Sequence, residues 1–375
     1  MCFAALRLIY LLVISMVLCG GKNCSVLSYG ALCDGRSDDT AAIQATLDAC
    51  SAPESSVIIP EGRTCLSQPL TLLNDTHLVL SPKSILKAGQ KWNDTTFISA
   101  RHRRNVWISG SGTVDGSGAQ WWTGYMYPGR PLLLDVWASN VLLEGFTLLN
   151  GATKHLHVEG NNVLIRNITI HSPNYTIAPE TDGIDVRAKD VWIDGVDVTN
   201  GDDSIVMKSG AENVLVTNSI VRQGNGLVIG TGANPPIRNI TFRNCRAEST
   251  KFGCHIKDKD AQTGDVYDVM FENVVISNPG SYAIGINQNG QGLGHPESDV
   301  RIRNVTFRNI TGRGKQAGRF VCNSFLPCTH ITMENVHLKS DEGCTFWHTY
   351  GNGTDVDPVS CVPPPEPVIK VLPMA

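Results

Sequence analysis

Three stretches of the chain repeat one pattern: NNVLIRNITI (161–170), KDVWIDGVDV (189–198) and ENVLVTNSIV (212–221). Each begins with polar residues, continues with alternating apolar residues, turns, and alternates again. Alternation with a period of two is typical of strands that bury one face. The pattern recurs along most of the chain, and the second residues of its copies stand at 105, 140, 162, 190, 213, 239, 268, 299 and 330.

The spacing of these copies, 22 to 35 residues, predicts a solenoid. No segment between the copies has the length and the 3.6-residue period of a crossover helix. We therefore expect an all-β protein, a right-handed parallel β-helix whose coils bury their inner side chains by stacking on one another. A β-sandwich and a β-propeller are the alternative folds, but propeller blades repeat at about 40 residues or more.

One short helix is expected before the repeats. The stretch DDTAAIQATLDAC (38–50) has a helical period, and Asp38 or Asp39 can cap its start. Its apolar face consists of Ala42, Ile43, Leu47 and Cys50. A helix there would cover the N-terminal end of the solenoid, which would otherwise expose strand edges. We expect a single β-helix catalytic domain over residues 22–375.

Residues 1–21 have the features of a secretory signal peptide. One early arginine precedes an apolar run from Leu8 to Leu18, and small residues follow. The run is shorter than the roughly 20 apolar residues of a membrane-spanning helix. The sequence thus predicts a protein secreted to the extracellular space or the cell wall, with no membrane association after cleavage.

The cysteines fit an oxidising compartment, because ten of the 12 lie beyond the leader and form an even set. Short loops close most easily, so Cys322–Cys328 and Cys344–Cys361 are the expected disulfides. The chain has no CxxC pair and no histidine-rich set, so no metal site is expected. Nine N-x-[ST] sequons are candidate glycosylation sites: Asn23, Asn74, Asn93, Asn167, Asn174, Asn239, Asn304, Asn309 and Asn352.

The overall charge argues against a nucleic-acid partner, since the formal net charge is −4. One basic run, Arg101 to Arg104, is interpreted as a solvated turn rather than a polyanion contact. A monomer is the expected state.

Acidic residues gather where neighbouring coils stack. When GIDV (183–186) is aligned with SIVM (204–207), Asp182 falls in the column of Asp203. A gapless alignment of the repeat from Lys189 with the repeat from Glu212 places Asp202 beside Asn225. Because stacked coils lie about 4.8 Å apart, we expect Asp182, Asp202, Asp203 and Asn225 to form one patch.

Three carboxylates in one patch cannot all ionise freely, so at least one pKa should rise. A protonated acid beside an ionised carboxylate is what glycoside hydrolysis requires. Turn chemistry is the structural alternative, but it explains one aspartate per coil rather than three in one patch. Calcium binding is the other functional alternative, because clustered oxygens attract hard cations.

The next coil adds a cation. In CHIKDKD (254–260), Lys257 points to the same side of its strand as His255. A cation beside the acids suggests an anionic substrate, such as a uronic acid. The alternative is that Lys257 pairs structurally with one of the aspartates.

These residues give the chain a resemblance to the polygalacturonases of glycoside hydrolase family 28, which cleave pectin on a β-helix. The similarity runs from VLSYGALCDGRSDDTAAIQATLDAC (26–50) to the cysteines at 344 and 361. Four family motifs are Asn-Thr-Asp, Gly-Asp-Asp, Gly-His-Gly and Arg-Ile-Lys. Here they read as the triplets that begin at Glu180, Gly201, Gly224 and His255. The resemblance implies that Asp202 is the general acid, that Asp182 and Asp203 hold and activate the attacking water, and that hydrolysis inverts the anomeric centre without a metal or organic cofactor.

Two positions of the family pattern differ. Asn225 replaces a histidine and cannot carry charge at neutral pH. His255 replaces an arginine and lacks its bidentate fork. A third and looser difference is Gly290, where the family is expected to have an aromatic residue. We assign substrate binding to Asn225, His255 and Lys257, in a site with altered specificity.

The leading functional hypothesis is an inverting hydrolase of α-1,4-galacturonan in pectin. A hydrolase of another pectic backbone such as rhamnogalacturonan, and a catalytically weakened pectin-binding homologue, are the alternatives. A calcium-dependent pectate lyase is a further alternative, but the predicted patch lacks the arginine base that such a lyase would use.

Overall fold

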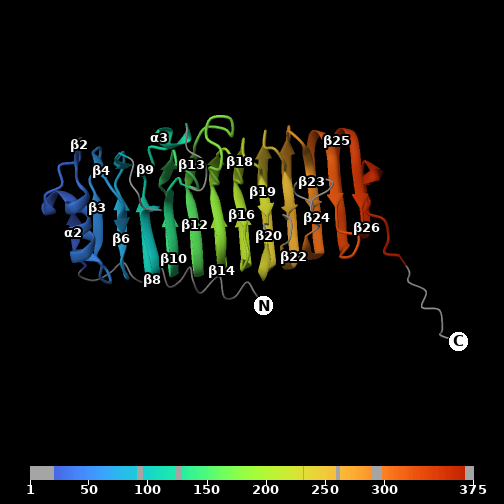
Figure 1. Cartoon of the computed structure of the whole chain (residues 1–375), viewed down its shortest axis with the longest axis horizontal. Coiled ribbons are helices and arrows are strands. Elements are labelled where there is room, and N and C mark those ends of the chain that lie inside the picture. The colour runs from blue at the N-terminus through green and yellow to red at the C-terminus, as the bar shows by residue number, and fades with distance from the viewer. Residues whose placement is uncertain are drawn as a thin grey trace.

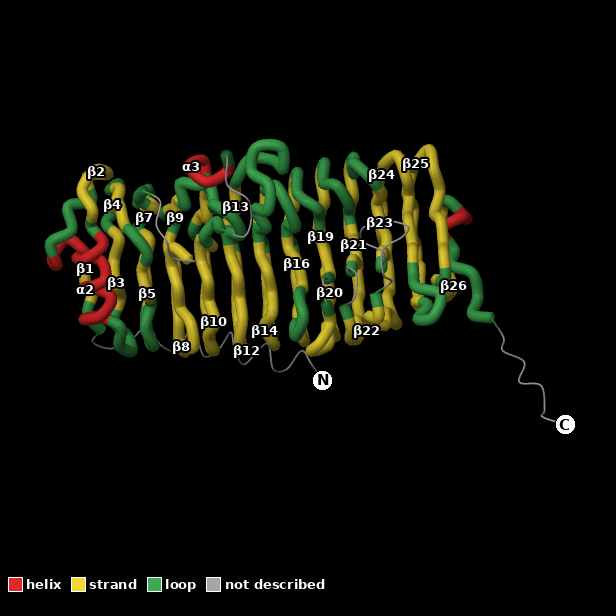
Figure 2. The backbone as a smooth tube through the Cα atoms, viewed as in Figure 1, coloured by secondary structure: helices red, strands yellow, loops and turns green. Residues whose placement is uncertain are grey.

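The computed structural model describes residues 21–90, 96–123, 129–230, 232–258, 262–288 and 298–367. Within them the chain winds into a row of stacked coils whose strands all pair in parallel with the coils before and after (Figure 1). Strands and turns account for nearly all of each coil (Figure 2). The predicted all-β parallel β-helix is confirmed.

Each coil contributes to three strand faces. The face that concerns us, here called the acid-bearing face, contains β5 (Leu70–Thr71), β16 (Ile205–Met207), β19 (Leu227–Ile229), β21 (Cys254–Lys257) and β23 (Tyr282–Asn287). The second face contains β1 (Asn23–Ser25), β3 (Ser56–Ile59), β6 (His77–Leu80), β17 (Glu212–Thr217) and β26 (Thr349–Asp357). The third contains β2 (Asp34–Asp38), β4 (Thr64–Ser67), β7 (Ile85–Ala88), β9 (Thr113–Asp115), β11 (Thr147–Leu149), β13 (Thr169–His171), β15 (Asp197–Thr199) and β18 (Ile220–Arg222).

Longer strands bend from one face to the next. They are β8 (Thr96–Gly110), β10 (Leu132–Glu144), β12 (Leu156–Arg166), β14 (Ile184–Asp194), β20 (Ala233–Glu248), β22 (Thr263–Ser277), β24 (Asp299–Val321) and β25 (Cys328–Trp347). The bend residue has a positive φ, as at Asn162 (57°) and Asp190 (56°), a conformation that asparagine and aspartate tolerate best after glycine. This explains the polar second residue of each repeat.

The predicted position of the bend residue in the eighth copy of the repeat, Asp299, is wrong. Its bend residue is Asn304, with φ of 54°, and not Asp299, because Arg303 pairs with Tyr267 and Val305 with Val269. Two polar-apolar alternations, SDVRI from Ser298 and RNVTF from Arg303, follow each other here, and their local pattern does not reveal which one contains the bend.

Apolar side chains from successive coils stack on one another in the interior. Phe242, Phe271 and Phe307 come from three successive coils, and their rings stack with centroid distances of 5.1 and 5.3 Å. All three are fully buried. Burying each such side chain contributes on the order of 2 kcal/mol, which makes the stacking of coils the source of stability.

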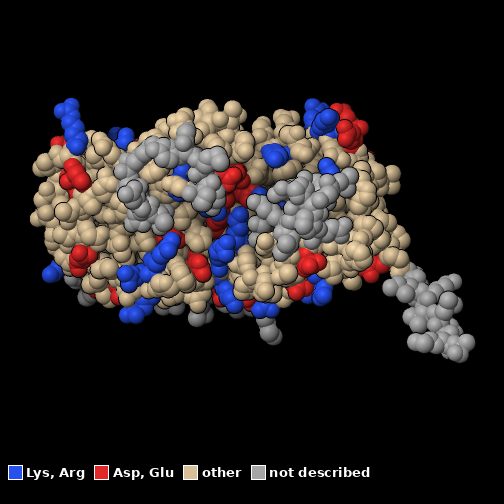
Figure 3. Space-filling view, in the orientation of Figure 1, with Lys and Arg blue, Asp and Glu red and all other residues tan. Residues whose placement is uncertain are grey.

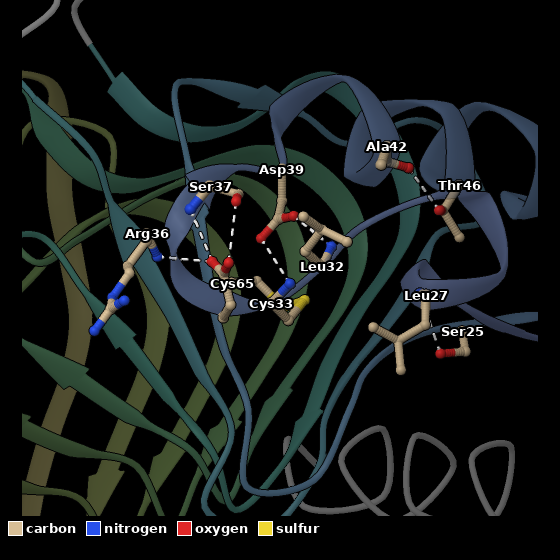
Figure 4. Close-up of a disulfide and its surroundings, with 11 residues drawn as sticks. Ser25, Leu27, Leu32, Cys33, Arg36, Ser37, Asp39, Ala42, Thr46 and Cys65 are labelled. Atoms are coloured by element: carbon tan, nitrogen blue, oxygen red, sulfur yellow. Dashed lines mark hydrogen bonds between the residues drawn. A yellow bond between two sulfur atoms is a disulfide. The ribbon is translucent and has the colours of Figure 1, made fainter.

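The N-terminal end is covered by α2 (Thr40–Cys50), as the periodicity predicted (Figure 1). Ile43 and Leu47 are fully buried. The carboxylate of Asp38 accepts a hydrogen bond from Thr40 N–H at 3.0 Å, while Asp39 turns away and accepts from Leu32 and Cys33 N–H (Figure 4). The remaining helices are η1 (Val26–Tyr29), α3 (Ala119–Trp122) and η2 (Val359–Cys361).

Four disulfides lie at the two ends of the described chain. The predicted Cys322–Cys328 and Cys344–Cys361 pairs are both present, and Cys24–Cys50 and Cys33–Cys65 join them. Cys245 and Cys254, which the sequence left unassigned, are free thiols buried inside the solenoid.

Three predictions fall wholly or mostly on residues outside the described ranges: the signal peptide over 1–21, of which only Gly21 is described, the sequon at Asn93, and Gly290. In the described part of the chain, no helix is long and apolar enough to cross a membrane.

Candidate active site

The predicted acid patch exists on the acid-bearing face. β14 pairs with β16 through Ile184 and Ile205, so Asp182 and Asp203 stand in one column, as predicted. Each of Asp182, Asp202 and Asp203 offers a carboxylate oxygen within 4.8 Å of the others. Acidic and basic side chains gather near the middle of the face that Figure 3 shows.

Asn225 belongs to this patch, but its predicted register was wrong by one residue. It stands in line with Asp203 rather than Asp202, because Ile205 pairs with Leu227. The spacing between the two coils is 23 residues at Asp197–Ile220 and 22 residues at Ile205–Leu227, so the turn between them loses one residue, which a gapless alignment cannot represent. The Nδ2 of Asn225 nevertheless donates to Oδ1 of both Asp202 and Asp203, each at 2.9 Å.

Three lysines connect most of the acids into one chain of alternating charge. Lys257 Nζ lies 2.6 Å from Asp203, and Lys208 Nζ lies 3.6 Å from Asp203 and 3.9 Å from Asp182. Lys154 Nζ lies 3.4 Å from Asp182 and also pairs with Asp185. We call this series, Asp185–Lys154–Asp182–Lys208–Asp203–Lys257, the lysine-linked chain.

Asp202 stands outside the lysine-linked chain. Among the described residues it forms no ion pair, and it holds Asn225 and the backbone N–H of Asp203 instead. Burial raises its pKa to about 6, and the negative charge of Asp203 adds to the effect. Its carboxyl group therefore keeps a proton in weakly acidic solution.

Asp203 has the opposite character. Burial alone would raise its pKa, but the charges of Lys257 and Lys208 and the hydrogen bonds of Lys257 and Asn225 outweigh burial and lower it. It therefore remains ionised. A protonated Asp202 beside an ionised Asp203 is the acid and base combination that glycoside hydrolysis uses.

The pKa values of Asp182 and Asp185 are also shifted in opposite directions. Burial and the charge of Asp185 raise the pKa of Asp182 well above its ordinary value. The pKa of Asp185 is lowered, because Lys208 and Lys154 outweigh its burial. The expectation that at least one pKa in the patch rises therefore agrees with both Asp182 and Asp202.

His255 lies beneath the surface of the site, only 3% exposed. Its ring stacks on Phe252 at a centroid distance of 4.2 Å, and its Nδ1 lies 3.0 Å from the hydroxyl of Tyr282. Burial and the charge of Lys257 lower its pKa to about 3, so the ring is neutral. A positive charge for a substrate carboxylate is therefore missing at the position where the family motif has arginine, and direct substrate contact by His255 stays a prediction.

Calcium binding fits this patch poorly. Three carboxylates do converge, but lysine Nζ atoms already lie against Asp182 and Asp203 from two sides. A hard cation there would be repelled by the lysines and would compete with them for the same oxygens.

Sequence reasoning missed Lys154, Lys208 and Asp185. The same column argument could have found the lysines: Lys208 and Lys257 both follow an inward residue of the column Met207, Ile229 and Ile256. Lys154 precedes Leu156 by two residues, as Asp182 precedes its column partner Ile184. Asp185 faces outward on β14 beside His157 of β12.

Comparison with known proteins gives a consistent answer. The model of the "Glycosyl hydrolases family 28" matches residues 50–354. "Probable rhamnogalacturonase C" of Aspergillus niger is 29% identical over 88% of this chain and 73% of its own. "Polygalacturonase-2" of Solanum lycopersicum is 29% identical over 86% of this chain and 76% of its own.

Solved structures share the fold. A polygalacturonase from Erwinia carotovora superposes with a TM-score of 0.76 at 23% identity, covering 90% of this chain and 98% of that one. An endo-xylogalacturonan hydrolase from Aspergillus tubingensis superposes with a TM-score of 0.77 at 20% identity, covering 89% and 99%.

Proposed function

The chain belongs to the glycosyl hydrolases family 28, and from this premise we propose that it hydrolyses the backbone of pectin with Asp202 as general acid. The observation that carries the proposal is the contrast between Asp202, which keeps its proton to about pH 6, and Asp203, which two lysines hold ionised. Asp202 protonates the glycosidic oxygen as the bond breaks, and Asp203 accepts the proton of the attacking water. Asp182, which lies beside Lys208 with Asp203, holds that water from its other side.

We propose that the reaction inverts the anomeric centre. The nearest carboxylate oxygens lie within 4.8 Å, closer than the roughly 6.5–9.5 Å separation that is usual between the two carboxyl groups of inverting enzymes. What supports inversion is the resemblance to the family, together with a second carboxyl group, that of Asp182, which can hold a water with Asp203. The test is the anomeric configuration of the first product, followed by proton NMR within minutes of mixing. If the first product retains the anomeric configuration, inversion is wrong, and Asp203 would act as a nucleophile instead.

The first candidate substrate is α-1,4-linked galacturonan. Lys257 supports it, because an ammonium group with 22% of its side chain exposed lies beside the acids and can meet a uronate carboxylate. The tomato relative, named a polygalacturonase, is consistent with this choice.

The second candidate is rhamnogalacturonan, in which galacturonate alternates with a neutral sugar. The neutral, buried ring of His255 favours it, because the site then lacks one of the two cations of the family motif. The relative from Aspergillus niger, named a rhamnogalacturonase, is equally similar to this chain.

One experiment separates these candidates. Purified protein is incubated with polygalacturonate and with rhamnogalacturonan from pH 4 to pH 7, and new reducing ends are measured. Release from only one polymer identifies the substrate. Release from neither, with binding retained, would leave the weakened binding protein as the function. Ultraviolet-absorbing unsaturated products that a chelator abolishes would instead identify a lyase.

We further propose that the protein is secreted to the cell wall as a monomer, with residues 1–21 removed. The eight paired cysteines support an oxidising compartment. Mass spectrometry of protein from the culture medium, with the N-terminus sequenced, tests the cleavage site. Retention of the apolar leader on the mature chain would contradict it.

A further inference from the structure

The acid-bearing face carries a second charged group toward its N-terminal end. Asp135 of β10, His157 of β12 and Asp185 of β14 stand in one column on three successive coils. The column therefore leads from the lysine-linked chain to Asp135 in two coil steps, a distance of about 10 Å at the usual strand spacing.

Asp135 is buried, with 1% of its surface exposed, although it lies on the outer side of its strand. Its Oδ2 accepts a hydrogen bond from Arg101 Nε at 2.5 Å, and its Oδ1 lies 2.8 Å from His157 Nδ1. Burial would raise its pKa, but His157 and Arg101 together lower it, so the carboxylate is ionised. One buried anion thus fixes an arginine and a histidine from the coils on either side of it.

The interpretation of Arg101 to Arg104 as a solvated turn is wrong for Arg101, which lies within β8 and pairs with the buried Asp135. The edges of Arg101 and His157 that point away from Asp135 remain exposed. Arg101 uses only Nε on Asp135, its side chain is 49% exposed, and none of the described residues accepts a hydrogen bond from its terminal amino groups. The imidazole of His157 is 18% exposed. Trp137 pairs with Arg101 in the strand register, contacts the ring of His102 at a centroid distance of 3.8 Å, and still exposes 36% of its surface.

We propose that Arg101 and His157, oriented by Asp135 and flanked by Trp137, form a distal subsite for the carboxylate of a uronate unit in the bound polysaccharide. A guanidinium fork matches a carboxylate, and an indole ring beside it offers an apolar surface to a sugar face. Two coil steps exceed the length of one sugar, so the subsite contacts a unit that is not adjacent to the cleaved bond. The inference rests on the proposed function, since it requires a pectic chain along this face.

The alternative is that Arg101 and His157 only neutralise a buried aspartate. The two readings differ in ligand length and ligand charge. A distal subsite acts only on oligomers long enough to reach it and only on free carboxylates. A purely structural ion pair affects every ligand equally through folding.

The test measures binding in the Asp202→Asn background, so that turnover does not consume the ligand. Galacturonate oligomers of increasing length are titrated by calorimetry against that parent and against the added change Arg101→Leu. We expect the long-to-short affinity ratio to fall about tenfold with Arg101→Leu, and to fall less with Arg101→Lys, which keeps the charge but not the fork. Fully methyl-esterified long oligomers should bind the parent and the Arg101→Leu protein equally.

Arg313→Leu is the matched control, because Arg313 is an exposed arginine on the third face, paired in register with Ser277. It should leave the length ratio unchanged. Arg101→Leu/Asp135→Asn, which removes the unpaired buried charge, should show the same loss as Arg101→Leu if folding is not the cause, with thermal unfolding recorded for each protein.

An unchanged length ratio in Arg101→Leu, or an equal loss with esterified oligomers, overturns the subsite while leaving the proposed function intact. If the parent neither binds nor, with Asp202 restored, cleaves galacturonan or rhamnogalacturonan, the proposed function and the subsite both fail.

Discussion

Two halves of one acid patch differ in their neighbours. Asp203 lies between Lys208 and Lys257, whereas Asp202, the preceding residue, has an amide, Asn225, and no ion-pair partner in the described chain. Burial raises the pKa of both carboxyls, and at Asp203 the two lysines, helped by the hydrogen bond from Asn225, outweigh it. The comparison shows that two adjacent aspartates acquire opposite proton affinities, because Asp203 lies against a lysine of its own coil and a lysine from two coils further along, and Asp202 pairs with neither.

The largest effect is expected from removing the unpaired acid. Asp202→Asn should lower kcat by about 10³-fold, because an amide cannot donate the proton to the leaving oxygen, while oligomer binding persists. Reducing-end assays and calorimetry measure the two quantities. Asp48→Asn, on the exposed side of α2, removes the same charge far from the site and should leave both unchanged. A loss of binding equal to the loss of kcat would assign Asp202 to substrate binding alone.

Removing Lys208 from the lysine-linked chain should reduce the difference in pKa between Asp202 and Asp203. Lys208→Met removes a cation from both Asp203 and Asp182, so the pKa of Asp203 rises and it protonates at higher pH. We expect about 10–100-fold lower kcat below pH 5, with a smaller loss near pH 6 and little change in KM.

Because the lysine pairs with buried carboxylates, Lys208→Met should also destabilise the fold by about 3 kcal/mol. Denaturant unfolding measures this cost, and Lys208→Arg should recover much of the stability. If the acidic limb of the pH profile does not move in Lys208→Met, Lys208 does not control the pKa of Asp203.

The dependence of the rate on pH should follow the protonation of Asp202. Asp202 has a raised pKa of about 6, so its protonated form persists below that pH and disappears above it. The rate should fall tenfold per pH unit above about pH 6. Asn225→His introduces a side chain that becomes cationic in weakly acidic solution, which should lower the pKa of Asp202 and move this limb to lower pH. If this limb moved to higher pH in Asn225→His, the assignment of the limb to Asp202 would be wrong.

The smallest effect is expected at the far end of the lysine-linked chain. Asp185→Asn removes a negative charge that raises the pKa of Asp182, so that pKa should fall, and kcat should change by less than about tenfold. Lys154→Met alone leaves two buried acids short of a cation and should be worse than the double variant Lys154→Met/Asp185→Asn. Additive effects in this cycle would show that the two residues act separately.

The sequence alone predicted the solenoid and the pairing of Asp182 with Asp203, because both depend on a strand period that the side-chain pattern displays. It placed Asn225 one residue out of line, because register changes in turns whose length the pattern does not reveal. It missed Lys154 and Lys208 because a lysine at a strand end has the same local signature as any solvated residue. Only their stacking against Asp182 distinguishes them.

The two buried thiols, Cys245 and Cys254, can be used to detect separation of the coils. Cys254 is fully enclosed on β21 directly beneath the acid-bearing face, and burial raises the pKa of Cys245 to about 11. Both are therefore unreactive toward alkylating reagents while the coils stay closed. Pulsed labelling followed by mass spectrometry would time the separation of the central coils, independently of the ends that the disulfides clamp.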